Sequence, residues 1–174
     1  NLQVEVARIR SSINQLPQNQ SNLFNDIDVE INSLNQSERL TDLYNRLNSN
    51  LGLTLVGGTP QQVYNLIKMS GQSRAELFDV VIIDEASQMD VANAILPLCS
   101  LAQGGTLILA GDPKQLPPIH KAEAPLGLEN MVGNVYSFMK DFNQVTEVML
   151  DRNYRSNKQI VELGYIAGYG RNLV

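Results

Sequence analysis

From residue 51 onward, short apolar runs alternate with stretches of helical spacing, and this alternation constrains the fold more than any other feature of the sequence. Four runs have the composition of strands: residues 53–56, 80–83, 106–110 and, more weakly, 146–150. Helical spacing marks three stretches: residues 61–69, 91–101 and about 130–142. The alternation predicts a parallel sheet in an α/β domain, and the nearly continuous apolar runs predict strands covered on both faces. Reactive groups in such sheets gather at the carboxyl ends of the strands.

Two carboxylates, Asp84 and Glu85, directly follow the apolar run 80–83 in the sequence VIIDEASQ. Charges at the end of a buried strand are costly unless a cation or a solvated cleft meets them. Mg²⁺ bound to the phosphates of a nucleotide is such a partner, because it keeps most of its waters and needs only one or two carboxylates. Asp84 would then hold the Mg²⁺ shell, and Glu85 would polarise the attacking water as general base. The alternative is an acidic cap at a helix N-terminus.

The turn GDPKQLPP, residues 111–118, ends the next apolar run. A glutamine near a γ-phosphate can hydrogen-bond the phosphate or its attacking water without adding charge. Gln115 could therefore sense which nucleotide is bound, while the flanking prolines restrict the backbone. The alternative is an ordinary surface turn.

The third polar element is LDRNYRSN, residues 150–157. An arginine at a domain boundary can reach a phosphate as an arginine finger, and a tyrosine can stack on a base. Taken alone, these residues could equally cap an ordinary helix that begins near Ser156 and Asn157.

In this order and at these spacings, VIIDEASQ, LILAGDPKQLPP and LDRNYRSN resemble motifs II, III and IV of superfamily 1 helicases. The DEAS form and the complete GDPKQLPP are most similar to superfamily 1B, the nonsense-mediated-decay helicase type. LVGGTP, residues 55–60, resembles the motif Ic region more loosely. The resemblance covers residues from about 53 to 174.

This resemblance implies a RecA-like P-loop NTPase fold and an ATP-dependent helicase or translocase that moves on single-stranded DNA or RNA. It implies that Asp84 coordinates Mg²⁺ and that Glu85 activates the attacking water. It further implies that Gln115 contacts the γ-phosphate of ATP and couples it to binding of the nucleic-acid track.

The resemblance also implies roles for residues nearer the ends of the chain. Arg155 would approach the γ-phosphate from a second RecA-like domain, with Tyr154 beside the adenine. Asp112 is expected on the nucleotide side of the site, and Thr59 would contact a nucleic-acid backbone.

No G-x-x-x-x-G-K-[ST] sequence occurs in the chain. A Walker A loop of this form supplies the backbone amides and the lysine that cradle the phosphates. In the family this loop precedes the DE motif, so we expect it upstream of Asn1, and we expect the later motifs of the second domain beyond the C-terminus. The partners of this piece would be the remaining helicase domains, and the isolated piece is expected to be inactive.

Residues 1–50 are rich in Asn, Gln and Ser and contain no glycine. Their apolar residues recur at helical spacing in three sets, over residues 6–16, 23–34 and 40–47. This predicts two or three amphipathic helices with breaks near residues 17–19 and 35–37, the last helix beginning near Ser37. These helices would form either a hairpin packed on the main domain or an arm that contacts a partner or nucleic acid. The predicted organisation is a helical arm over 1–50, the C-terminal part of a first RecA-like domain over 51–150, and a linker with the start of a second over 151–174.

Composition limits the remaining classes of protein. No apolar run approaches the roughly 20 residues of a membrane helix, so no membrane partner is expected. The single cysteine, Cys99, permits no internal disulfide and suits a reducing compartment, the cytoplasm or, in a eukaryote, the nucleus. Cys99 and the lone His120 offer no metal-ligand cluster. The net charge of −5 gives no sign of a large phosphate-binding surface on these 174 residues.

Two rival interpretations remain. One is a degenerate helicase-like module kept for protein or nucleic-acid binding, which the acidic charge and the helical arm favour. Intact Asp84, Glu85, Gln115 and Arg155 argue against it. The other is a different P-loop motor, such as a nuclease-fused or defence-system ATPase, because such proteins share these motifs.

Overall fold

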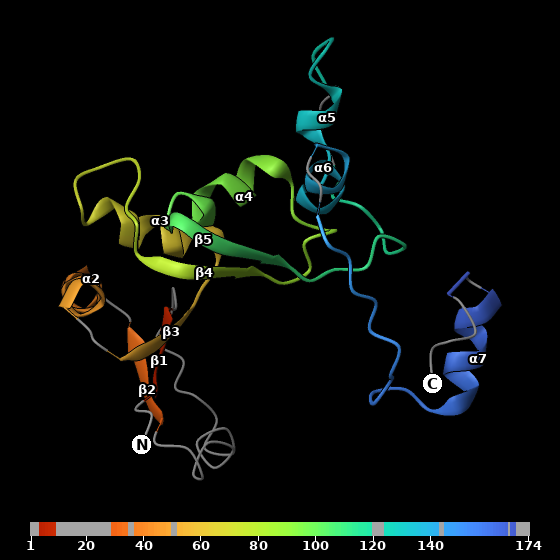
Figure 1. The fold of residues 1–174 in the computed structure, drawn as a ribbon, viewed down its shortest axis with the longest axis horizontal. Coiled ribbons are helices and arrows are strands. Elements are labelled where there is room, and N and C mark those ends of the chain that lie inside the picture. The colour runs from red at the N-terminus through yellow and green to blue at the C-terminus, as the bar shows by residue number, and fades with distance from the viewer. Residues whose placement is uncertain are drawn as a thin grey trace. The chain divides into compact units, whose positions relative to one another are not determined.

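The computed structural model describes residues 4–9, 29–34, 37–49, 52–119, 124–142, 145–166 and 168–169 (Figure 1). The chain divides into two compact units, Asn1–Phe142 and Asn143–Val174, and each is described by itself. The predicted domain boundaries near residues 50 and 150 stay predictions.

The first sheet contains three parallel strands in the order β2-β1-β3: β1 (Val4–Ile9), β2 (Val29–Leu34) and β3 (Leu53–Gly57). Val4 of β1 is paired with Val29 of β2 and with Leu53 of β3. The helices expected near residues 6–16 and 23–34 are therefore wrong over β1 and β2. Both strands start with β-branched residues two positions apart, as in VEV and VEI, and this alternation favours a strand that can pair with neighbours. Residues 10–28 of the predicted helical arm lie outside the described residues.

The third expected helix of this region is confirmed as α2 (Ser37–Ser49), which begins at the predicted serine. α3 (Pro60–Lys68) follows β3. Thr59 caps α3 and Pro60 occupies its first turn, where a missing N–H costs nothing. Leu43 of α2 and Leu66 of α3 form one small core, with exposed fractions of 2% and 0%.

The second sheet pairs β4 (Phe78–Ile83) with β5 (Leu101–Leu109) in parallel, and these strands lie side by side in Figure 1. α4 (Val91–Leu98) connects them, as a parallel pair requires. Asp90 caps α4 by accepting a hydrogen bond from the backbone N–H of Asn93 at 2.7 Å. The predicted α/β class with parallel strands is confirmed.

The core of this second sheet lies on one face. Val81 and Ile83 of β4 are buried there with Ala94 of α4 and Val135. On the opposite face, Ile82 is 64% exposed. The expectation of strands covered on both faces is therefore wrong for the described residues of this sheet, because Val80 in β4 and Ile108 in β5 are also 49% and 45% exposed. The strand-like runs also divide between two sheets instead of sharing one.

Two short helices complete the first unit, α5 (Glu129–Val132) and α6 (Val135–Phe142). The helix expected over about 130–142 is thus interrupted at Gly133 and Asn134. The side chain of Asn134 accepts a hydrogen bond from the backbone N–H of Ser137 at 2.8 Å and so begins α6 anew.

The second unit contains α7 (Lys158–Ile166), with Val161 buried. Asn157 caps this helix through a 3.0 Å hydrogen bond from the backbone N–H of Ile160. The weak strand candidate 146–150 is wrong, because these residues have no regular structure and Val148 is 81% exposed. Within the part of the chain that the structure describes, no strand pairs with this run, and a single apolar run has no ladder to join.

Candidate functional site

The turn after β4 carries both predicted carboxylates. The side chain of Asp84 accepts a 3.0 Å hydrogen bond from the backbone N–H of Glu85, and both side chains are exposed. Glu85 has φ of +52°, the left-handed region, which costs a residue with a side chain about 1–2 kcal/mol. A non-glycine residue held in this region is a recurrent feature of functional sites. The carboxylate pair is therefore presented by a strained turn and is not part of a relaxed helix cap.

The turn after β5 is joined to the turn after β4 through the backbone. The N–H of Ala86 donates to the carbonyl of Ala110 at 2.8 Å, and the N–H of Ala110 donates to the carbonyl of Ile83 at 2.9 Å. The N–H of Asp112 donates to the hydroxyl oxygen of Ser87 at 3.2 Å, and the Ser87 side chain is 2% exposed. These bonds hold the two motifs together at the carboxyl ends of the parallel strands, as predicted.

Gly111 permits this close approach. A Cβ added at Gly111 would lie 2.9 Å from the backbone nitrogen of Ser87 and 3.1 Å from that of Ala86. Backbone atoms cannot move aside as the end of a flexible side chain can. Any larger residue at this position would therefore push the two turns apart.

Side chains extend the connection between the two turns. Gln88 Nε2 lies 2.9 Å from Gln115 Oε1 and 3.4 Å from Glu85 Oε2. Gln115 Nε2 in turn donates to Asp112 Oδ2 at 3.4 Å. The structure thus brings together three residues predicted for the site, Glu85, Gln115 and Asp112.

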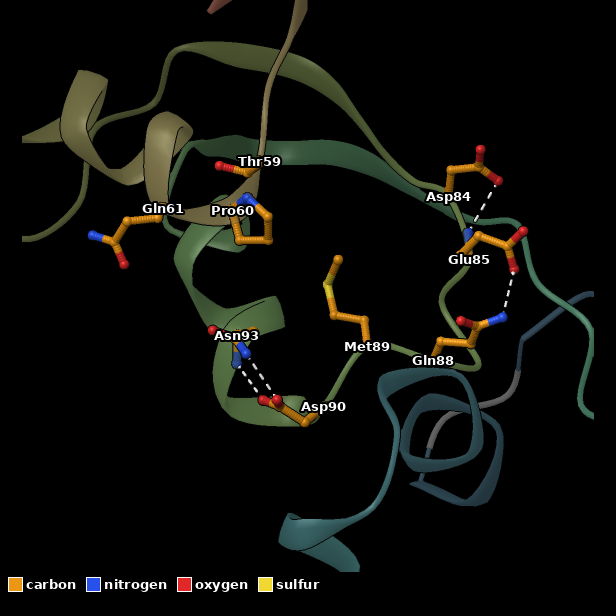
Figure 2. Close-up of a pocket in the computed structure, with 9 residues that line it drawn as sticks. All are labelled: Thr59, Pro60, Gln61, Asp84, Glu85, Gln88, Met89, Asp90 and Asn93. Atoms are coloured by element: carbon orange, nitrogen blue, oxygen red, sulfur yellow. Dashed lines mark hydrogen bonds between the residues drawn. The ribbon is translucent and has the colours of Figure 1, made fainter. Parts of the chain in front are cut away.

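A cavity of about 380 Å³ opens beside the carboxylates (Figure 2). Asp84, Glu85 and Gln88 line it, and Thr59 lines it from the start of α3. The Thr59 hydroxyl accepts a 3.4 Å hydrogen bond from the N–H of Gln62, and the Gln62 side chain accepts one of 2.8 Å from the N–H of Thr59. Thr59 therefore has a structural role as a helix cap, and its predicted contact with nucleic acid stays a prediction.

Tyr154 and Arg155 belong to the second unit. Both side chains are exposed, and the side chain of Asn153 accepts a 2.9 Å hydrogen bond from the N–H of Arg155. It also accepts one of 3.1 Å from the N–H of Ser156. The turn thus presents the two side chains to solvent, and their predicted roles at the nucleotide stay predictions.

Gln88 and Ser87 both lie inside the DEASQ motif, but the sequence alone indicates no role for either. Gln88 closes the turn, since its backbone N–H donates to the carbonyl of Glu85 at 2.8 Å, and its side chain reaches Gln115. The signal in the sequence for such a role is that Gln88 follows the general-base candidate Glu85 by three residues. Its partner 27 positions away was not visible without the fold.

Two further findings concern what the site could hold. Among the residues that the structure describes, no three His, Cys, Asp or Glu side chains gather closely enough to bind a metal ion by themselves. In the same part of the chain, no helix combines the length and the apolar character needed to cross a membrane.

Comparison with known proteins gives relatives of one kind. Residues 66–123, which include both joined turns, match the AAA domain family. The chain is 30% identical over 130 residues to the DNA polymerase alpha-associated DNA helicase A of Saccharomyces cerevisiae, covering 70% of this chain and 18% of that protein. It is 33% identical over 85 residues to an uncharacterised ATP-dependent helicase of Methanocaldococcus jannaschii, covering 49% of this chain and 12% of that protein.

A third relative is the RNA helicase Mov10l1 of Mus musculus, 28% identical over 116 residues, which covers 58% of this chain and 10% of that protein. The matched region thus spans less than a fifth of each of these relatives. No solved structure gives a significant match. The described parallel strands and helices have the α/β character of a RecA-like domain. The relatives and the motifs agree on what the chain is similar to: ATP-dependent helicases of superfamily 1, of the nonsense-mediated-decay type.

Proposed function

We propose that this chain is the central part of an ATP-dependent helicase or translocase, and that its two joined turns form one side of the ATP-hydrolysis site. The observation that carries the proposal is the link from Glu85 through Gln88 to Gln115 at the edge of the second sheet. A general-base candidate and a phosphate-sensor candidate are thereby held within one hydrogen-bonded group. A surface turn with no chemical role has no need of such a link.

Asp84 suits the role of Mg²⁺ ligand. Its side chain is exposed beside the cavity, and the N–H of Glu85 fixes one of its carboxylate oxygens. Because the described residues provide no three-ligand cluster, the ion would bind here together with the phosphates of ATP. When bound, Mg²⁺ would neutralise charge on the phosphate oxygens.

Glu85 suits the role of general base. Its strained backbone projects the carboxylate beside the cavity, and Gln88 holds one of its oxygens by a 3.4 Å hydrogen bond. The carboxylate would accept a proton from the water that attacks the γ-phosphate of ATP. Water must reach this position, and the exposed side chain allows it.

Gln115 suits the role of phosphate sensor. Its oxygen accepts from Gln88, so its NH₂ group is the end left to donate. One N–H hydrogen is directed to Asp112. A primary amide carries two such hydrogens, and the second would suit an anionic phosphate oxygen. In this arrangement Asp112 orients the amide on the nucleotide side.

The track would be single-stranded nucleic acid. One relative is named as a DNA helicase and another as an RNA helicase, so we include both kinds of strand. Thr59 would contact the backbone of the strand. Tyr154 and Arg155 would approach the nucleotide from a second RecA-like domain, and ATP binding would close the cleft between the two domains. We propose that the chain acts within a longer protein that supplies the phosphate-binding loop, and that alone it does not hydrolyse ATP.

The test is the Glu85→Gln variant of the full-length protein that carries this sequence. ATP turnover should fall at least about a hundred-fold, while ATP affinity changes little, because the amide keeps the shape of the carboxylate but cannot accept the proton. Glu76→Gln, at an exposed glutamate outside the cavity, is the matched control and should turn over ATP normally. Unchanged turnover in Glu85→Gln would remove Glu85 from the chemistry. A wild-type protein that binds nucleic acid and never hydrolyses ATP would support the degenerate binding module instead.

A further inference from the structure

Gln88 stands between two residues with proposed roles in hydrolysis. Its Nε2 atom lies 2.9 Å from Gln115 Oε1 and 3.4 Å from Glu85 Oε2. Its two partners belong to different motifs. Glu85 lies in the same turn as Gln88, whereas Gln115 lies 27 residues further along the chain. Gln88 itself lines the cavity beside Glu85 (Figure 2).

The chemistry of the partners sets the direction of every bond in this group. A carboxylate accepts hydrogen bonds and cannot donate them, so Gln88 must turn its NH₂ group toward Glu85. That group carries two hydrogens and can also donate to the oxygen of Gln115. The NH₂ group of Gln115 then points to the Asp112 carboxylate, which again only accepts. Because the carboxylates of Glu85 and Asp112 lie at the two ends of this group, the side-chain amide of each glutamine can take only one orientation.

The backbone around Gln88 is held independently of this side chain. Ala86 is 0% exposed and Ser87 is 2% exposed. The backbone of Ala86 and the hydroxyl group of Ser87 are both hydrogen-bonded to the turn after β5. The Gln88 side chain, in contrast, is exposed. Removing its amide should therefore break the side-chain link without unfolding the turns.

We infer that Gln88 is a positioning residue that couples the general-base candidate Glu85 to the phosphate-sensor candidate Gln115. This inference rests on the proposed function. A change at the Gln115 amide alters the acceptor available to Gln88, and Gln88 in turn holds one oxygen of the Glu85 carboxylate. Gln88 acts through these two residues and needs no contact with the nucleotide.

The test is Gln88→Met in the full-length protein, because Met has a similar length and no hydrogen-bond donor. ATP turnover is measured over a range of ATP concentrations, with and without a single-stranded oligonucleotide of deoxythymidine or of uridine. The stimulation by nucleic acid should fall about five-fold or more, while KM for ATP changes less than about two-fold. Gln72→Met is the matched control at an exposed glutamine outside the cavity, and it should keep the wild-type ratio. Gln88→Ala serves as a second variant. If both variants keep the wild-type stimulation by nucleic acid, the inference is overturned.

The double variant Gln88→Met/Gln115→Ala separates coupling from a general structural defect. If the two residues act as one link, the double variant should match Gln115→Ala within about two-fold. Defects that multiply would show that Gln88 acts independently of Gln115 and would overturn the inference. Normal stimulation in Gln88→Met together with loss of turnover in Glu85→Gln would defeat this inference and leave the proposed function intact. Absence of turnover in the wild type would defeat both.

Discussion

The backbone N–H of Ala86 donates to the carbonyl oxygen of Ala110 over 2.8 Å, and this bond continues the β4–β5 pairing beyond the ends of both strands. The reactive side chains on either side of it, Asp84 and Glu85 in one turn and Gln115 in the other, are therefore positioned by backbone contacts. Substitution of an exposed reactive side chain should leave this scaffold in place. Substitution of a residue at the contact between the two turns should instead disturb this scaffold.

Gly111→Ala should disrupt this contact. The added methyl group would meet the backbone nitrogen atoms of Ser87 and Ala86 at 2.9 Å and 3.1 Å, so we expect a loss of about 1–3 kcal/mol in the free energy of unfolding. Gly57→Ala is the control, because a Cβ there would meet nothing within 4 Å. Urea denaturation followed by circular dichroism measures both. Equal stability of the two variants would mean that the turns do not approach this closely.

Glu85→Gly should be more stable than Glu85→Ala, the reverse of the usual order. Glu85 has φ of +52°, and glycine adopts this region without the penalty of about 1 kcal/mol or more that a Cβ imposes. At the exposed Glu76, where φ is not positive, the alanine variant should instead be the more stable by about 0.5 kcal/mol. The same denaturation experiment compares the four variants. The ordinary order at both positions would show that the Glu85 turn carries no strain.

The motif-bearing strands were predictable because β4 and β5 contain runs of apolar residues that end at polar turns. The pairing of these two strands places the turns at one edge, so Glu85 and Gln115 could be expected together before the fold was known. The β1 and β2 strands were not predictable in this way. Their apolar residues fit helical spacing as well as strand spacing. The choice depends on partner strands that only the fold reveals, β3 for β1 and β1 for β2.

The link from Glu85 through Gln88 to Gln115 could not be predicted from the sequence either. A glutamine in a turn after a DE pair is compatible with many arrangements, and nothing in its neighbours specifies a bond to Gln115. The strain at Glu85 is similar, because the residue type does not indicate a positive φ. Features that depend on two segments meeting in space require the coordinates of both.

Thr59→Asp should separate the two roles considered for this residue. Aspartate caps a helix as well as threonine does, so the free energy of unfolding should change by less than about 0.5 kcal/mol, whereas Thr59→Ala should lose about 1 kcal/mol. If Thr59 contacts a nucleic-acid backbone, the new negative charge should weaken binding of a fluorescent single-stranded oligonucleotide, measured by anisotropy. Thr59→Ser keeps both the cap and the hydroxyl group and serves as the control. Wild-type binding by Thr59→Asp would restrict Thr59 to its capping role.

Arg155→Ala should lower ATP turnover strongly if Arg155 acts as an arginine finger. Such residues contribute about a thousand-fold or more to turnover by stabilising charge on the transferred phosphate. Arg155→Lys should recover little of this activity, because an ammonium group lacks the planar fork of donors. Arg152→Ala removes an exposed arginine from the same segment and should be close to wild type. Since both arginine side chains are exposed, neither alanine variant should alter the free energy of unfolding by more than about 0.5 kcal/mol. Steady-state ATP hydrolysis with saturating nucleic acid measures the effect, and equal activity of the two alanine variants would assign Arg155 to the solvent-exposed surface alone.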